Sequence, residues 1–237
     1  MLIVPVIDKG FVSEWAPQFD QAAHDYSEYE PILETVRDEI SGSGTISEAT
    51  FRRIYAWKSS RSLATVKWQK FNKIYQPRLR LAFSDSFPEH HKLRVLVWTE
   101  KKLRDKLPVL PHVLADIYGD AAGVRAPVAS AVLHFAYPQK FPIIDVRTAE
   151  MLYFARRISS TERTDCQYDD FMAQILALAG ESCSTIRELD KALFAFHYLR
   201  LQPAMNCLFQ RMTNQQELSL TLDNPADFRR MIIDKIR

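Results

Sequence analysis

One segment, residues 121 to 152, restricts the fold of this chain more than any other: AAGVRAPVASAVLHFAYPQKFPIIDVRTAEML. Gly123 predicts a tight turn, because glycine tolerates the left-handed backbone that such turns need. The helix that should follow the turn has small residues such as Ala129 on its buried face. A short apolar run then ends at Asp145, and aspartate is a residue type that caps helix N-termini. A turn, a helix and a capped second helix in this order predict a helical protein.

Helical patterns continue outside this segment, whereas alternating strand patterns are few. Ser47 or Thr45 should cap the helix that carries Phe51, Ile54 and Tyr55 inward. A capping box of Thr185 and Glu188 starts a later helix, and Ser-Gly-Ser-Gly should end the first one. Apart from the helix capped at Ser47 or Thr45, the predicted helices cover about residues 16–40, 63–83 (with a bend at Pro77), 92–104, 112–118, 127–137, 146–158, 167–179, 185–200 and 225–237.

We therefore expect an all-α fold for the 237 residues. Residues 1–44 form an acidic helical segment and residues 45–237 a helical domain with a hairpin at 112–137, or the whole chain is a single domain. Two lobes with a cleft between them would place Asp145 in the wall of that cleft.

The composition suits a protein with a real hydrophobic core, since 47% of the residues are hydrophobic and 25% are charged. An odd number of widely spaced cysteines is no disulfide framework and favours a reducing compartment: Cys166, Cys183 and Cys207. The N-terminus lacks the pattern of a signal peptide, and no apolar run approaches the roughly 20 residues of a membrane span. No spacing of His, Cys and carboxylate residues indicates a metal site. We expect a cytoplasmic protein without membrane contact, cofactor or metal.

Charge is distributed unevenly, although the net charge is only +2. Residues 1–48 hold ten acidic and two basic residues, and residues 49–84 hold nine basic residues and no acidic one. Clustered lysine and arginine residues release counterions from a phosphate backbone. The basic residues of the second segment are Arg52, Arg53, Lys58, Arg61, Lys67, Lys70, Lys73, Arg78 and Arg80.

The order of turn, small-faced helix, apolar run and aspartate resembles the helix-hairpin-helix DNA glycosylases. The family pattern Leu-x-Gly-Val-Gly-x-x-x-Ala is matched at Gly123, Val124 and Ala129, with Arg125 in place of the second glycine. The family segment Pro-Val-Asp-x-x-Val is similar to the run that ends at Asp145, although the usual Thr-His is absent. The resemblance covers about residues 105–160 by motif. The iron-sulfur cluster of several members needs four cysteines, and this chain has three.

The resemblance implies a glycosylase-like helical bundle that extrudes a base from double-stranded DNA and excises it. Asp145 matches the catalytic aspartate. Pro127 occupies the position of the Schiff-base lysine of bifunctional members, so the enzyme should use water and leave an abasic site; Lys58 and Lys140 remain conceivable nucleophiles. The residues that we expect to contact the DNA backbone through the turn and the next helix are Gly123, Val124, Arg125, Ala126 and Arg147.

Aromatic residues interleave with the basic ones between residues 51 and 83, as an extruded nucleotide would require. Trp57 is expected to stack on a flipped base, with Tyr55 and His134 in the same base pocket. Packed core aromatics beside a solvated basic face are the alternative interpretation. The lysines and arginine of this segment that we expect to bind DNA are Lys58, Arg61, Lys67, Lys70 and Lys73.

Three functions fit these patterns. The first is a monofunctional DNA glycosylase that acts as a monomer in base-excision repair or in defence against phages with modified DNA. The second is a DNA-binding module of the same fold without catalysis, which would need no carboxylate at residue 145. The third is an all-α protein-interaction domain, in which the turn is a packing joint and binding does not depend on phosphate.

Overall fold

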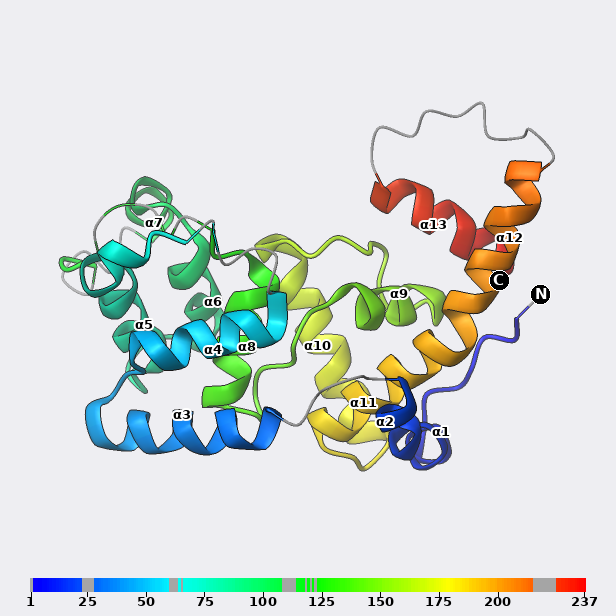
Figure 1. Cartoon of the computed structure of the whole chain (residues 1–237), viewed down its shortest axis with the longest axis horizontal. Coiled ribbons are helices and arrows are strands. Elements are labelled where there is room, and N and C mark those ends of the chain that lie inside the picture. Colours follow the sequence, from blue (N-terminus) through cyan, green and yellow to red (C-terminus); the bar gives the residue numbers. More distant parts are fainter. Residues whose placement is uncertain are drawn as a thin grey trace. The chain divides into compact units, whose positions relative to one another are not determined.

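The structure, a computed structural model, describes residues 2–22, 28–59, 64, 66–107, 114–117, 119, 121, 123–214 and 225–237. Every regular element within these ranges is a helix, so the expected all-α class is confirmed (Figure 1). None of the described helices combines the length and the apolar character that crossing a membrane requires.

Two compact units divide the chain, and neither is a continuous stretch of sequence. Unit 1 consists of residues 1–24, 144–163 and 170–237, and unit 2 of residues 25–143 and 164–169. The expected boundary between residues 44 and 45 falls inside unit 2. The cleft between two lobes stays a prediction.

In unit 2 the central helix is α8 (Ala126–Ala136), which packs against α3, α4, α5 and α6. Its small residues Ala129 and Ala131 are fully buried, as the sequence predicts, and they allow these neighbours to approach closely. Helix α3 ends at Gly44, which adopts the left-handed conformation with a φ of 68°. The other elements of this unit are α3 (Tyr29–Ser43), α4 (Glu48–Ser59), η3 (Trp68–Lys70), η4 (Phe71–Tyr75), α5 (Gln76–Phe83), α6 (Glu89–Val97) and α7 (Glu100–Lys106).

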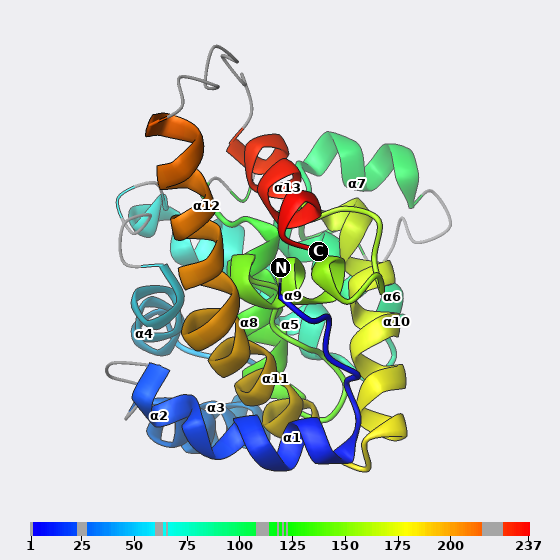
Figure 2. The same cartoon turned by 90° about the vertical axis from the view of Figure 1, so that its right-hand side faces the viewer.

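In unit 1 the central helix is α11 (Ile186–Phe196), which packs against α1, α2 and α9 (Figure 2). Its predicted capping box is confirmed, since Thr185 Oγ1 accepts the Glu188 N–H at 3.1 Å and Glu188 accepts the Thr185 N–H at 2.8 Å. Helix α10 (Asp165–Glu181) begins in unit 2 and continues in unit 1. The other elements are α1 (Lys9–Trp15), η1 (Ala16–Gln18), α2 (Phe19–Ala22), α9 (Val146–Phe154), η5 (His197–Leu201), α12 (Gln202–Asn214) and α13 (Pro225–Ile236).

Several predicted helices are wrong in extent. The helix expected over 16–40 is a 3-10 turn, the short α2 and then α3, and residues 23–27 lie outside the described residues. A separate helix, α1, precedes this span, because Asp8 caps it by accepting the Phe11 N–H at 2.9 Å. The helix expected over 63–83 is a 3-10 turn, a π-helix and then α5, with Pro77 in the first turn of α5. The helix expected over 92–104 is two helices, separated where Trp98 and Thr99 are extended and Thr99 caps α7. Of the helix expected over 112–118, residues 114–116 form a turn, and residues 112, 113 and 118 lie outside the described residues.

Candidate functional site

Asp145 caps the N-terminus of α9, as the sequence predicts. Its Oδ1 atom accepts the N–H groups of Arg147 at 2.7 Å and Thr148 at 2.9 Å. The Thr148 side chain accepts the Asp145 N–H at 3.3 Å and completes a capping box. Asp145 itself is half-buried. These bonds place Oδ1 at the positive end of the helix dipole, where a negative charge is stabilised.

The helix that carries Asp145 is anchored by a buried glutamate that the sequence patterns do not reveal. Glu150 on α9 is 1% exposed, and its carboxylate lies 2.6 Å from Nε2 of the buried His197. Arg229 on α13 donates to the same carboxylate through Nε and through Nη2, the latter at 2.8 Å. Burial alone would raise the pKa of Glu150, but the hydrogen bonds from Arg229 and His197 outweigh it and hold the pKa below its ordinary value.

Arg147, an expected DNA contact, lies one residue after the start of α9. Its guanidinium carbon is 4.6 Å from the ring centroid of Phe194 and 6.0 Å from that of Tyr198. Both distances are typical of cation–π contacts, and the side chain is half-buried. Its role as a DNA contact stays a prediction.

The glycine turn before α8 is held by side chains from other elements of unit 2. Gly123 has a φ of 85°, which L-residues rarely adopt, and its carbonyl accepts the hydroxyl of the buried Tyr55. Gly119 has a φ of 61°. Its N–H donates to Glu100 at 2.6 Å, and its carbonyl accepts Nη2 of Arg78 at 2.5 Å. The turn is therefore fixed by hydrogen bonds at both of its glycines.

The N-terminus of α8 follows this turn directly. Arg125 is its N-cap residue, is exposed and makes no side-chain cap, and Pro127 lies in the first helical turn. Val128 and Ala129 both donate their N–H groups to the Arg125 carbonyl at 3.0 Å. Val124 and Ala126 are buried, and the Val124 N–H donates to the Ala121 carbonyl at 3.2 Å.

The three residues expected in the base pocket are packed within unit 2. Tyr55 is fully buried and faces the Gly123 carbonyl. His134 is 1% exposed; its Nδ1 lies 2.8 Å from the Phe141 carbonyl and its Nε2 lies 2.8 Å from the Tyr29 hydroxyl. Because a carbonyl only accepts, Nδ1 carries the proton and, in the neutral ring, Nε2 accepts from the hydroxyl. The half-buried Trp57 packs against Tyr29, at 6.2 Å between ring centroids.

Arg52, Arg53 and Arg78 of the 49–84 segment have structural partners among the described residues. Arg52 pairs with Glu48 at 2.7 Å and stacks on Trp68 at 4.0 Å from its ring centroid, and Arg53 pairs with Glu28 at 2.6 Å. Arg78 is fully buried and donates to the carbonyls of Val95 at 2.7 Å and Trp98 at 2.8 Å. It thereby satisfies the C-terminal carbonyls of α6, which a helix leaves without partners.

Four other cations of this segment are exposed. Within the part of the chain that the structure describes, no carboxylate lies at ion-pair distance from the exposed residues Lys67, Lys70, Lys73 and Arg80. Lys58 is half-buried near the end of α4. Arg61, expected to bind phosphate, lies outside the described residues.

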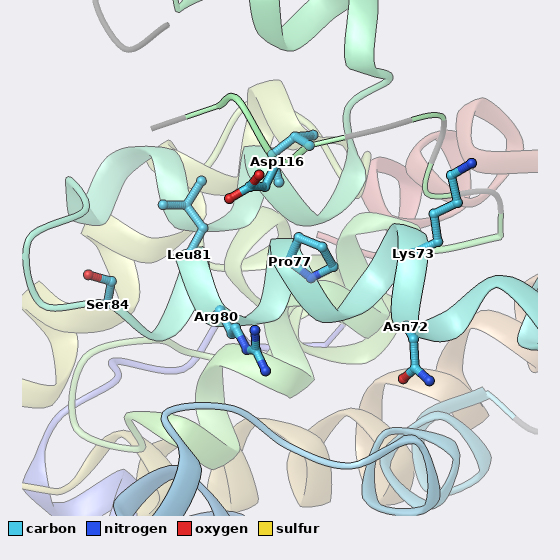
Figure 3. A pocket seen from close by; sticks show the side chains of 8 residues that line it. Asn72, Lys73, Pro77, Arg80, Leu81, Ser84 and Asp116 are labelled. Atoms are coloured by element: carbon cyan, nitrogen blue, oxygen red, sulfur yellow. The ribbon is translucent and has the colours of Figure 1, made fainter. Parts of the chain in front are cut away.

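These exposed cations line two hollows of unit 2. The first, of about 520 Å³, has Lys73 and Arg80 in its wall, and Figure 3 shows their side chains projecting from the helical stretch of η4 and α5. The second, of about 650 Å³, contains Lys67 and Lys70 together with residues of α7. The remaining lining residues of the first hollow are Asn72, Pro77, Leu81, Ser84, Asp116 and Ile117.

Among the described residues, no group of three or more histidine, cysteine, aspartate or glutamate side chains is arranged to hold a metal ion. The three cysteines are exposed thiols. Comparisons with protein-family models, with curated proteins and with solved structures each found no match.

Proposed function

We propose that this protein is a monofunctional DNA glycosylase that acts on a damaged or modified base in double-stranded DNA. The observation that carries the proposal is the carboxylate of Asp145, whose Oδ1 accepts two backbone N–H groups at the start of α9. The order of glycine turn, helix α8, apolar run and aspartate is similar to the helix-hairpin-helix glycosylases, and this similarity is the reason to propose a role beyond capping for this carboxylate.

In the proposed reaction the bond between C1′ of the sugar and the base nitrogen breaks after the base has left the helical stack. Positive charge develops on the sugar, as in glycoside hydrolysis, and a nearby carboxylate stabilises it. Asp145 also accepts a proton from the attacking water, whose oxygen bonds to C1′. The base leaves with the electron pair of the broken bond and gains a proton. The products are the free base and an abasic site.

The backbone of the glycine turn and the N-terminus of α8 would hold a phosphate of the DNA. Helix N-termini bind anions because their first N–H groups have no partner in the helix and lie at the positive end of the dipole. In α8 the donor would be the Ala126 N–H, because Pro127 has no N–H and Val128 donates to the Arg125 carbonyl at 3.0 Å. The exposed Arg125 would add a charged donor at the same place. The exposed lysines of the 49–84 segment would hold further phosphates.

The direct test is incubation of the protein with a panel of DNA duplexes, each carrying one damaged or phage-type modified base. Release of one base, together with strand breaks that appear only after alkali, would support the proposal. DNA binding without base release on any duplex of a broad panel would favour the non-catalytic DNA-binding module. Failure to bind any duplex would favour the third function, an all-α protein-interaction domain.

We expect no covalent protein–DNA species when borohydride is added during excision. Trapping needs a Schiff base and thus a free amine, whereas the nitrogen of Pro127 lies within a peptide bond. Lys140 is a poor substitute, because its hydrogen bond with Glu89 at 2.6 Å raises its pKa and keeps it protonated. The measurement is a gel-shift assay of labelled duplex after reduction. Efficient trapping would contradict the monofunctional reaction and direct attention to Lys58.

Replacement of Lys67, Lys70 and Lys73 by alanine should make DNA binding less dependent on salt. The slope of log K against log salt should fall by up to about 0.9 for each phosphate contact that is lost. The matched control is alanine at three exposed lysines elsewhere in the described chain, Lys9, Lys106 and Lys235, which removes the same charge. Equal slopes for the two triple variants would place the DNA away from the basic segment.

A further inference from the structure

We infer that the hollow between residues 67–74 and helix α7 is a second backbone-phosphate site for double-stranded DNA, in which Lys101 of α7 acts together with Lys67 and Lys70. This inference rests on the proposed function, since it assigns a further DNA contact to the same protein. It adds α7, which the sequence patterns do not implicate, to the DNA-binding surface.

The hollow joins two segments that are about thirty residues apart in the sequence and a glycine of the turn region. Residues 67–74 form one wall and the first turns of α7 form the other, with Gly119 between them. It encloses about 650 Å³, and its lining residues are Lys67, Lys70, Ile74, Glu100, Lys101, Arg104, Asp105 and Gly119.

Positive charge is in excess in this hollow, where four cations face two carboxylates. Glu100 is already engaged, because it accepts the Gly119 N–H at 2.6 Å and Nε of Arg104 at 3.2 Å. These bonds, the backbone bond above all, hold the pKa of Glu100 below its ordinary value. Asp105 is exposed on the same helix.

The three lysines of the hollow have no acidic partner among the residues that the structure describes. None of the described carboxylates lies within ion-pair distance of Lys67, Lys70 or Lys101, and all three side chains are exposed. Three ammonium groups around one hollow repel one another, and an anion bound between them would relieve that repulsion. By contrast, Lys102 on the same helix pairs with Asp165 at 3.3 Å.

Both walls of the hollow are fixed by hydrogen bonds and buried side chains. The Lys67 N–H donates to the Tyr75 hydroxyl at 3.1 Å, and Ile74 is buried. Thr99 caps α7 by accepting the Lys102 N–H at 3.1 Å, and Leu103 anchors the helix in the core. The lysine stems therefore start from a rigid backbone, which lowers the ordering cost of binding.

The lining selects phosphate rather than a nucleobase. None of the described lining residues is aromatic, so they offer a base no ring on which to stack. Ammonium groups on flexible stems suit phosphate oxygens, which they meet as point charges. The ligand should also be an extended polyanion. The neighbouring hollow with Lys73 and Arg80 continues the same cationic tract, and Arg104 donates to the carbonyl of Ile117 in its wall at 3.3 Å.

The test compares Lys101→Ala with Lys106→Ala, two single variants of exposed lysines on α7. Only Lys101 lines the hollow. The probe is a fluorescein-labelled, unmodified duplex of about 20 base pairs, titrated at several salt concentrations. Lys101→Ala should lower the slope of log K against log salt by about 0.9, whereas Lys106→Ala should leave it near the native value. Equal slopes for the two variants would overturn the inference.

A Lys101→Glu variant strengthens the test, because it places a negative charge against the expected phosphate. It should bind the same duplex more weakly than Lys101→Ala, and a Lys106→Glu control should not show this difference. Unmodified duplex needs no excision, so the outcome is independent of the proposed chemistry. A slope change in Lys101→Ala without base release by the native protein would support the hollow and reject the glycosylase. Base release by the native protein, with equal slopes for both alanine variants, would support the glycosylase and reject the phosphate site in the hollow.

Discussion

An Asp145→Asn variant is expected to fold and to bind DNA as the native protein does, but to excise its base about 10² to 10⁴ times more slowly. Asparagine is nearly isosteric with aspartate and is as good an N-cap, so its side-chain oxygen can accept the same N–H groups of Arg147 and Thr148. It lacks the charge that would stabilise the developing cation and accept the proton of water. The measurement is single-turnover base release at saturating protein.

The matched control for this experiment is Asp8→Asn. Asp8 caps α1 by accepting the Phe11 N–H at 2.9 Å, so the same chemical change is made at a helix cap of no proposed function. Thermal unfolding of both variants should lie close to that of the native protein. Native excision rates in a folded Asp145→Asn variant would show that the aspartate only caps the helix, and the proposed mechanism would fail.

The second large effect is expected in stability. Arg229→Ala should lower the free energy of unfolding by roughly 3 to 5 kcal/mol at neutral pH, because it leaves the Glu150 carboxylate buried without its main partner. Glu150 is 1% exposed, and Arg229 contacts both of its oxygens. Urea unfolding measures the effect. Arg230→Ala is the control, since Arg230 pairs with the half-buried Asp227 on the same helix and its loss should cost less than about 1 kcal/mol.

The loss should depend on pH with a definite sign. In the native protein the pKa of Glu150 lies below its ordinary value of 4.5, so its contribution to stability is present above that value. This contribution disappears as the pH falls through the pKa of the folded protein. Without Arg229, burial should raise the pKa of Glu150 above its value in the native protein. The difference in stability between native protein and variant should therefore be larger at pH 7 than at pH 4. A difference that grew on acidification would contradict the assigned role of this pair.

Features that depend on neighbouring residues could be predicted from the sequence. The caps at Asp145 and Thr185, the glycine end of α3 and the small buried face of α8 all follow from interactions over a few residues. Helix extents were less predictable. Apolar spacing continues across Trp98 and Thr99, although the backbone is extended there, and it does not distinguish the π-helix η4 from an α-helix.

The tertiary structure decided which charged residues are free to act and which hold the fold together. Arg78 and Lys73 look alike in a basic segment, yet Arg78 is buried among carbonyls from α6 and the turn, and Lys73 is exposed. The partners of Glu150 lie 47 and 79 residues away, and Lys101 joins Lys67 only in the folded chain. The sequence by itself determined the helical class, the caps and the position of Asp145, because local hydrogen bonds and side-chain size decide them. Partnerships between distant charges were decided only by packing, because each depends on where the rest of the chain places the second group.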